Sequence, residues 1–184
     1  MRTSFVGLLL IMLPFFIFHC SSLKEEPAAS ELNREDLPDQ ESWQSSIFIT
    51  KEGRRVAIIN AGYIASYQKK QITVLSDSIH VDFYDNDGNH NSILTADEGI
   101  VYNQTNNLTA TGNVYVVSDS GIVLQTKELR WDNKRQKIVS EVPVIFTTDT
   151  DTLLGDSFIS DPTLKNYELR NARGYSRRVI KLEK

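Results

Sequence analysis

A pattern of thirty residues repeats without a gap in the second half of this chain, where Leu94-Thr95-Ala96 recurs as Leu124-Gln125-Thr126. Apolar positions follow both segments at matching spacing: Val101, Leu108, Val114 and Val116 after the first, and Trp131, Ile138, Val144 and Phe146 after the second. Periods of roughly 20 to 50 residues are typical of stacked architectures, in which each unit covers the apolar face of the next. We therefore expect the function to lie in a continuous surface and not in one catalytic cleft.

The repeat extends more faintly in both directions. Ile59-Asn60-Ala61 precedes the first segment by 35 residues, and Leu154-Gly155-Asp156 follows the second by 30. We therefore expect about four units, each too small to bury its own apolar side. Each should hold about four short strands, for example at 92–96, 99–103, 107–111 and 113–118.

Alternation of apolar and polar residues predicts that these units are built from strands. Ile79, Val81 and Phe83 alternate with His80 and Asp82, and a period of two is the pattern of a strand with one buried face. Residues that favour turns separate the alternating runs at 85–89, 104–106, 118–121 and 132–135. The sequence thus predicts one all-β domain over residues 47–184.

Equivalent positions in two units should face the same way. Comparing the units therefore shows which residues face inward and which face outward. Ile100 corresponds to Arg130, which is costly to bury without a partner, while Val101 corresponds to Trp131. Gly112 and Pro143 occupy near-equivalent places and predict bends where the chain changes sheet. The residues predicted to face inward are Leu94, Val101, Leu108, Val114, Val116, Leu124, Leu129, Trp131, Ile138, Val144, Phe146, Leu154 and Ile159.

The amino terminus, residues 1–20, has the pattern of an export signal. Arg2 precedes an apolar run from Phe5 to Phe18, and Cys20 follows it. A fourteen-residue helix would span only about 21 Å, short of the roughly 30 Å hydrocarbon core of a bilayer. Cys20 is the single cysteine, so no internal disulfide is possible. Its position resembles a lipoprotein box, which predicts lipid attachment at Cys20; the alternative is an uncleaved signal anchor.

Residues 21–46 are acidic and proline-containing, which predicts a flexible tether. Arg2 is the only charged residue before Cys20, so the chain from Cys20 onward carries 19 of the 20 basic residues and all 24 acidic ones, a net charge of −5. A nucleic-acid binder would normally carry a basic excess, so we expect no nucleic-acid partner.

Two clusters of possible metal ligands have simpler explanations. Asp85, Asp87 and Asn89 alternate as in a calcium loop, but His90 and Ala96 stand where that loop needs glycine and glutamate, so a hairpin turn is favoured. His80 and His90 lack cysteine partners and make a poor zinc set, so a solvated strand face is favoured. The sequence predicts no metal and no other cofactor.

Two further features could carry chemistry or bind phosphate. Glu98 and Glu128 could form the carboxylate pair of a glycosidase, but residues repeated in register usually belong to a turn or a solvated ladder, and we expect no enzyme. The basic carboxy-terminal tail could bind phosphate, although a frayed, solvated terminus is the simpler explanation. Its basic residues are Arg170, Arg173, Arg177, Arg178, Lys181 and Lys184.

Taken in order, the motifs over about residues 50–174 resemble the lipopolysaccharide-export family LptC. The residues that carry the resemblance are Ile59-Asn60-Ala61, Leu94-Thr95-Ala96-Asp97-Glu98-Gly99, Gly112-Asn113-Val114, Gly121 with Leu124-Gln125-Thr126, Leu129-Arg130-Trp131-Asp132, Ser140 to Val144 and Leu154-Gly155. The resemblance implies a twisted, half-open β-jellyroll of two antiparallel sheets. It also implies that Ile59 and the inward-facing residues above line an apolar groove for the acyl chains of lipopolysaccharide.

The resemblance also implies partners and a location. In that family the module accepts lipopolysaccharide from an inner-membrane ABC transporter of the Lpt type and passes it to an LptA-like periplasmic bridge protein. Open strand edges join such modules, and the candidates here are Val56, Ile58 and Asn60 facing the transporter, and Asn166, Glu168 and Arg170 facing the next module. The module would lie at the periplasmic face of the inner membrane. The competing hypothesis is a structural or adhesive β-solenoid surface lipoprotein with a filled core.

Overall fold

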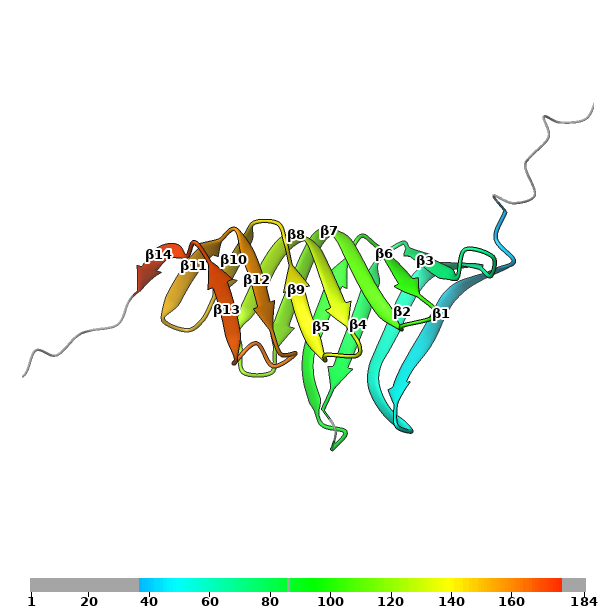
Figure 1. Ribbon diagram of the computed structural model, residues 1–184, viewed down its shortest axis with the longest axis horizontal. Helices are drawn as coiled ribbons and strands as arrows, with labels where there is room; N and C mark the ends of the chain where they lie inside the picture. The colour runs from blue at the N-terminus through cyan, green and yellow to red at the C-terminus, as the bar shows by residue number, and fades with distance from the viewer. Residues whose placement is uncertain (1–36, 86, 177–184) are drawn as a thin grey trace, which may run out of the picture. The chain divides into compact units, whose positions relative to one another are not determined.

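The computed structural model describes residues 37–85 and 87–176, and within them every regular element is a β-strand (Figure 1). The predicted all-β fold is therefore confirmed. The strands are β1 Gln40–Lys51, β2 Arg54–Tyr67, β3 Ile72–Ser76, β4 Ile79–Tyr84, β5 His90–Ala96, β6 Glu98–Tyr102, β7 Asn107–Ser118, β8 Val123–Asp132, β9 Lys137–Ser140, β10 Val144–Thr147, β11 Asp151–Gly155, β12 Ser157–Ser160, β13 Tyr167–Arg170 and β14 Arg173–Ser176.

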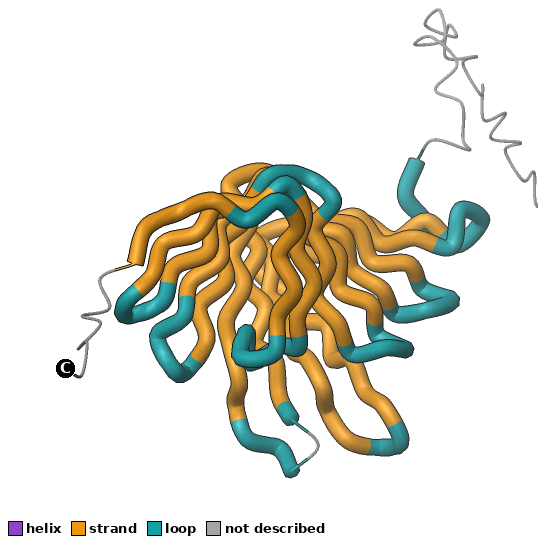
Figure 2. Tube along the Cα trace, turned by 60° about the vertical axis from the view of Figure 1, so that its left-hand side comes forward, coloured by secondary structure: helices purple, strands orange, loops and turns teal. Residues whose placement is uncertain are grey.

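The strands form one continuous antiparallel sheet that folds along a line of bends into two halves (Figure 2). We call this line the crest and the opposite side, where the halves diverge, the mouth. The first half-sheet has the order β1-β2-β4-β5-β7-β8-β10-β11-β14, and the second has the order β1-β2-β3-β6-β7-β8-β9-β12-β13. The long strands β1, β2, β7 and β8 contribute to both halves.

Glycine and asparagine make the bends that the crest needs. Gly112 has φ +72° and Asn113 has φ +42°, a backbone region that favours glycine and tolerates asparagine. Here β7 shifts its register against β8 and passes from the second half-sheet to the first. A Cβ atom at Gly112 would lie 2.5 Å from Asp97 Oδ2, so glycine is also required for space. The predicted bend at Gly112 is confirmed, and Pro143 likewise lies between strands of different halves.

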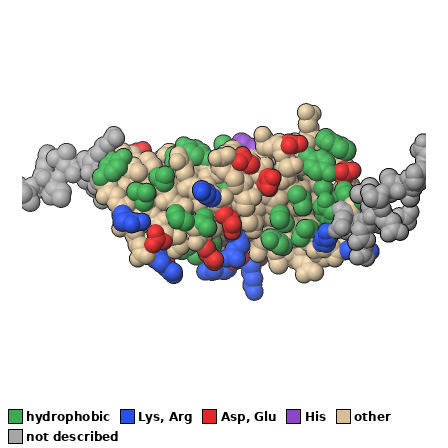
Figure 3. Space-filling view, turned by 90° about the horizontal axis from the view of Figure 1, so that it is seen from above, with side chains coloured by type: hydrophobic (Ala, Val, Ile, Leu, Met, Phe, Trp, Pro, Cys, Tyr) green, Lys and Arg blue, Asp and Glu red, His purple; other side chains and the backbone are tan. Residues whose placement is uncertain are grey.

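A hydrogen-bonded clasp repeats along the crest. Asn113 Nδ2 donates to Asp97 Oδ2 at 2.8 Å, and two units later Asn171 Nδ2 donates to Asp156 Oδ2 at 2.7 Å. In both clasps the aspartate backbone N–H also donates across the bend, to Gly112 O and to Arg170 O, at 3.0 Å. The crest is therefore fixed by side-chain and backbone hydrogen bonds together. Charged and apolar side chains are mixed on its outer surface (Figure 3).

In the unit between those that carry Asp97 and Asp156, the bend has no such clasp, and hydroxyl groups take its place. Ser140 Oγ donates to Glu128 O at 2.9 Å, and Thr126 Oγ1 donates to Pro143 O at 3.1 Å. The backbone groups at this bend thus find partners in short polar side chains, which is the usual way in which irregular, half-buried backbone is satisfied.

The amino-terminal boundary of the domain differs from the prediction. The sequence pattern places residues 40–46 in the tether, but they form the first part of β1 and pair with β2 from Gln40↔Ser66 onward. This segment is polar, and pairing with the exposed side of β2 orders it. The preceding tether residues up to 36, the signal segment with Cys20, and the tail from Arg177 lie outside the described residues.

Candidate functional site

The space between the two half-sheets is lined on one side by an unbroken row of apolar side chains. Successive strands of the first half-sheet place their members opposite one another in register. We call these residues the apolar row: Ile47, Ile59, Val81, Leu94, Val116, Leu124, Phe146 and Leu153. Since neighbouring strands lie about 4.8 Å apart, the seven steps of this row cover about 34 Å. The row gives the site a continuous hydrophobic wall.

The second half-sheet supplies the opposite wall. Its inward positions at the mouth are also in register across β2, β3, β6, β7, β8, β9, β12 and β13. These residues are Ser66, Thr73, Val101, Leu108, Trp131, Ile138, Ser160 and Tyr167. The hydrophobic core between the halves contains members of both walls.

The two half-sheets touch at the mouth through an aromatic pair. Phe83 on β4 of the first half-sheet packs against Trp131 on β8 of the second, with ring centroids 5.0 Å apart and planes at 50°. Tilted aromatic contacts at this distance are favourable. The pair holds the halves together on the side away from the crest.

Twelve of the fourteen residues predicted to line a groove lie in the core, each with 3% or less of its surface exposed. They are Ile59, Leu94, Val101, Leu108, Val114, Val116, Leu124, Leu129, Trp131, Ile138, Val144 and Phe146. The interior is therefore closed at these positions, and a lipid chain would enter only if the half-sheets parted. Contact of these side chains with lipid stays a prediction.

The inward orientation predicted for Leu154 and Ile159 is wrong. Leu154 is 45% exposed on the outer face, and Ile159 is half-buried on the outer side of the second half-sheet. Their neighbours Leu153 and Phe158 point inward instead. A shift of one residue along a strand moves a side chain to the opposite face.

The interior is less completely covered at its two ends. At the amino-terminal end, a cavity of about 310 Å³ is lined by β1, β2 and β3, including Ile47, Ile64 and Thr73. At the carboxy-terminal end, Phe146 packs against Phe158 and Tyr167, with centroids 5.3 and 4.2 Å apart. Both ends expose members of the two walls, so the apolar interior continues to each end of the sheet.

The edge strands differ from the prediction at one end only. Val56, Ile58 and Asn60 do not form an edge, because β2 is paired with β1 on one side and β4 on the other. Within the described part of the chain, β1 is the edge there, with β2 as its one neighbour. At the other end, Asn166, Glu168 and Arg170 lie on or beside β13, which pairs with β12 alone, and β14 pairs with β11 alone.

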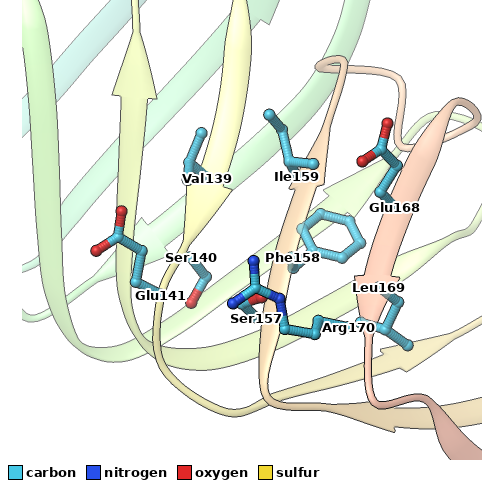
Figure 4. Close-up of a pocket in the computed structure, with 9 residues that line it drawn as sticks. All are labelled: Val139, Ser140, Glu141, Ser157, Phe158, Ile159, Glu168, Leu169 and Arg170. Atoms are coloured by element: carbon cyan, nitrogen blue, oxygen red, sulfur yellow. The ribbon is translucent and has the colours of Figure 1, made fainter.

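A small pocket lies beside the β13 edge on the outer face. It has a volume of about 300 Å³ and is formed by β9, β12 and β13. Figure 4 shows Arg170 extending toward Ser157, with Glu141 and Glu168 on either side and Val139 and Ile159 above. Charged groups of both signs therefore accompany the free edge.

A larger outer cavity, of about 640 Å³, was not predicted. Tyr115, Ile145 and Leu154 line it on β7, β10 and β11, with Lys127 and Arg173 at its border. Ile145 and Leu154 are cross-strand partners. The same alternation that correctly placed Val114 and Val116 inward leaves Tyr115 outward, so this signal was present in the sequence.

The candidate metal ligands have structural roles. The Asp85 carboxylate accepts hydrogen bonds from the Asn89 side chain and from the backbone N–H groups of Asn89 and Asp87, which hold the pKa of Asp85 below its usual value. The predicted hairpin turn is confirmed. On the outer face of the first half-sheet, His80 and His90 each approach Asp82 to 3.4 Å, and His90 Nδ1 lies 2.7 Å from Asp119. The described residues contain no group of three or more ligands arranged for a metal.

Glu98 and Glu128 form part of an exposed ladder. Each is the cross-strand partner of Thr111 on β7, one on either side. Both side chains are exposed on the outer face, as expected for a solvated ladder. Of the basic tail, Arg170 and Arg173 are described, and Arg173 pairs with Asp156 at 3.6 Å. No described segment forms a helix of the length and apolarity needed to cross a membrane.

A family model described as "Lipopolysaccharide-assembly, LptC-related" matches residues 9–173 of this chain. The match covers β1 to β13 and the first residue of β14, and it begins inside the apolar run of the amino terminus. A search of curated proteins gives no match.

Proposed function

Because the chain belongs to the LptC family, and so to the machinery of lipopolysaccharide transport, we propose that its apolar interior accepts acyl chains of lipopolysaccharide without any catalytic step. The observation that carries this proposal is the apolar row, which runs from β1 to β11 without a polar interruption. Each methylene group transferred from water to such a surface contributes about 0.8 kcal/mol. Sugars and phosphates would stay outside the mouth, in water.

The interior opens at the mouth in this proposal. Core side chains fill the space between the half-sheets, so an entering chain must take the place of contacts such as that between Phe83 and Trp131. Crest hydrogen bonds hold the other side together. Parting of the halves about the crest would therefore expose the apolar row while leaving the strand pairing intact.

Photo-crosslinking in cells tests this function. A photoreactive residue in place of Val116, in the apolar row, should form adducts with lipopolysaccharide. The same residue in place of Arg130, which points outward on β8, should form none. Equal labelling at the two positions would contradict the proposed interior site.

The closed interior also favours a second function, that of a structural or adhesive β-solenoid with a filled core. Such a protein would keep its core side chains packed under all conditions. Absence of adducts at Val116, together with normal export of lipopolysaccharide in cells that lack this chain, would favour this second function over the first.

The two ends of the sheet are the proposed contacts with other transport components. Edge β1 would face an inner-membrane ABC transporter of the Lpt type, and edge β13 would face an LptA-like bridge protein, because unpaired strand edges bind further strands. A photoreactive residue in place of Glu168 should capture the bridge protein, and one in place of Arg130 should not. Capture of the transporter through Glu168 would reverse the assignment.

Members of the family are envelope proteins associated with the inner membrane. Lipidation of Cys20 is the proposed anchor, because two or more acyl chains suffice for stable attachment. Mass spectrometry of the mature protein should show an acylated amino-terminal cysteine, lost in Cys20→Ser. A mature protein that begins at Met1 would instead show an uncleaved anchor.

A further inference from the structure

Four serines are buried in the core, and one of them differs from the rest. Ser118 Oγ lies 2.9 Å from Ser120 Oγ and accepts from the Ile122 N–H, Ser140 Oγ donates to Glu128 O, and Ser160 Oγ donates to Asn166 O. Ser92 has none of its surface exposed, and its hydroxyl has no hydrogen-bond partner among the described residues.

Trp131 holds the second buried polar atom of this kind. Its Nε1 has no hydrogen-bond partner among the described residues, and its ring is packed against Phe83. Phe83 is also the cross-strand partner of Ser92. The two unpartnered polar atoms therefore lie on opposite half-sheets beside one phenylalanine, at the mouth.

An unpartnered polar atom in a core lowers stability, and most proteins avoid one. An alanine at 92 and a phenylalanine at 131 would complete the same core without this cost. Polar groups at these two places are instead explained by a ligand that supplies their hydrogen bonds.

We propose that Ser92 and Trp131 form a polar subsite that binds an oxygen atom of the linkage between an acyl chain and its headgroup. Trp131 Nε1 is a donor only, so its partner must be an acceptor such as an ester, amide or hydroxyl oxygen, while the Ser92 hydroxyl can donate or accept. This subsite rests on the proposed function.

The position of the subsite fits an amphiphile whose chains lie along the apolar row. Ser92 is two residues from Leu94 on the same strand and face, about 7 Å toward the mouth. A lipid with its chains on the row and its headgroup in water would place the linking oxygens at this level. Phe83 covers the subsite in the closed interior.

Alanine substitution of two buried serines tests the subsite in the full-length protein with purified lipopolysaccharide. Ser92→Ala should leave the melting temperature unchanged or higher, and should raise the dissociation constant about threefold to tenfold. Ser140→Ala, the control at the crest, should lower the melting temperature because its hydroxyl donates to Glu128 O, and it should leave the dissociation constant unchanged. Equal affinity of Ser92→Ala and wild type would overturn the subsite alone. Failure of the wild type to bind would overturn the proposed function as well.

The indole N–H signals of the two tryptophans give an independent test by NMR. Trp131→Phe identifies the Trp131 signal, and Trp43, which is 65% exposed, serves as the internal reference. Addition of lipopolysaccharide should move the Trp131 signal downfield as its N–H gains an acceptor, while Trp43 stays in place. Crosslinking at Val116 without any change in the Trp131 signal would contradict the subsite and leave the proposed function standing.

Discussion

The crest and the mouth of this sheet are built in opposite ways. At the crest, short polar side chains and backbone N–H groups satisfy the bends, and the Asp97–Asn113 clasp recurs as Asp156–Asn171. At the mouth, Ser92 and Trp131 keep unpartnered polar atoms, and the halves are joined by aromatic contacts, Phe83 with Trp131 and Phe146 with Tyr167. Stability is therefore concentrated on one side of the interior.

This difference indicates how the module can admit a lipid and remain folded. Local opening takes place where few stabilising interactions are lost, and here that place is the mouth. The crest would act as the fixed line about which the halves part. Substitutions at the crest should therefore affect stability first, and substitutions at the mouth should affect lipid binding first.

Gly62→Ala should have the largest effect, because Gly62 lies at the crest, between the part of β2 that pairs with β4 and the part that pairs with β3. A Cβ atom there would lie 2.4 Å from the backbone oxygen of Asp77 and would disturb the Gly62 N–H hydrogen bond to the same oxygen. Since backbone must move, we expect the free energy of unfolding to fall by about 3 kcal/mol, measured by chemical denaturation.

Gly88→Ala provides the control for this crest substitution. Gly88 has φ +86°, but a Cβ atom there would meet no other atom within 4 Å, so only backbone strain of about 1 kcal/mol is expected. An equal loss of stability in the two variants would show that the crest is no more rigid than a hairpin tip.

Leu164→Ala should have the next largest effect, and it acts on the mouth. Leu164 lies in the turn between β12 and β13, is fully buried in the core, and has φ +59°. Loss of its burial should lower the free energy of unfolding by about 2 kcal/mol, the lower end of the range for a buried leucine, because a turn can partly close around the space left. Unlike Gly62→Ala, it should also speed the entry of lipopolysaccharide, followed by crosslinking at Val116. An unchanged rate would contradict opening at the mouth.

The repeat predicts most of the core correctly because it compares equivalent positions in two units. At the bends of β2 and β8 the inward residues on either side are five apart, as in Ile59 and Ile64 and in Leu124 and Leu129. Along a regular strand, residues on one face are an even number of positions apart. An odd spacing means that the bend contains one extra residue, so the inward and outward positions are exchanged after it. Alternation within a single strand could not have shown this, whereas the comparison of units did.

The same repeat fails at its last unit for a related reason. There the inward pair is Leu153 and Phe158, which follows Leu124 and Leu129 by 29 residues and not by 30. Extending the longer period places Leu154 and Ile159 inward, one residue out of phase, and so on the wrong face. The unit is shorter by one residue, and no residue type marks the deletion.

Two other features depend on tertiary pairing and were not predictable from local pattern. Residues 40–46 are polar and have the composition of a tether, yet they pair with β2 because that strand offers a free side. The unpartnered state of Ser92 follows from its cross-strand neighbours on β4 and β7. Ser92 and the satisfied Ser118 are cross-strand partners, and nothing in the sequence separates their roles.

Asp97→Ala should have a smaller effect than either substitution above, because it removes one clasp and leaves the backbone in place. The loss of the Asn113 hydrogen bond should lower the free energy of unfolding by about 1 kcal/mol. Asp156→Ala, which removes the equivalent clasp, should cost a similar amount. Neither should change the affinity for lipopolysaccharide. A weaker affinity in both would show that the crest takes part in binding.

Acidification should produce the smallest effect, through the turn that carries Leu164. Burial by itself raises the pKa of Asp161, but hydrogen bonds from Thr163 and Asn166 and the charge of Lys137 outweigh it and hold the pKa below its usual value. A depressed pKa in the folded state means that the ionised carboxylate stabilises the fold above its ordinary pKa of 3.8, and that this contribution is lost as the pH falls below it. The melting temperature of Asp161→Asn should therefore approach that of the wild type as the pH falls from about 5.5 to about 3.

Asp85→Asn, at a hairpin without a core residue, should show a similar trend, because the pKa of Asp85 is also lowered. Of these two substitutions, only Asp161→Asn should also alter lipopolysaccharide binding. It alone loosens the turn that holds Leu164, whose side chain closes the interior. Equal binding by the two variants would mean that the β12–β13 turn does not govern the mouth.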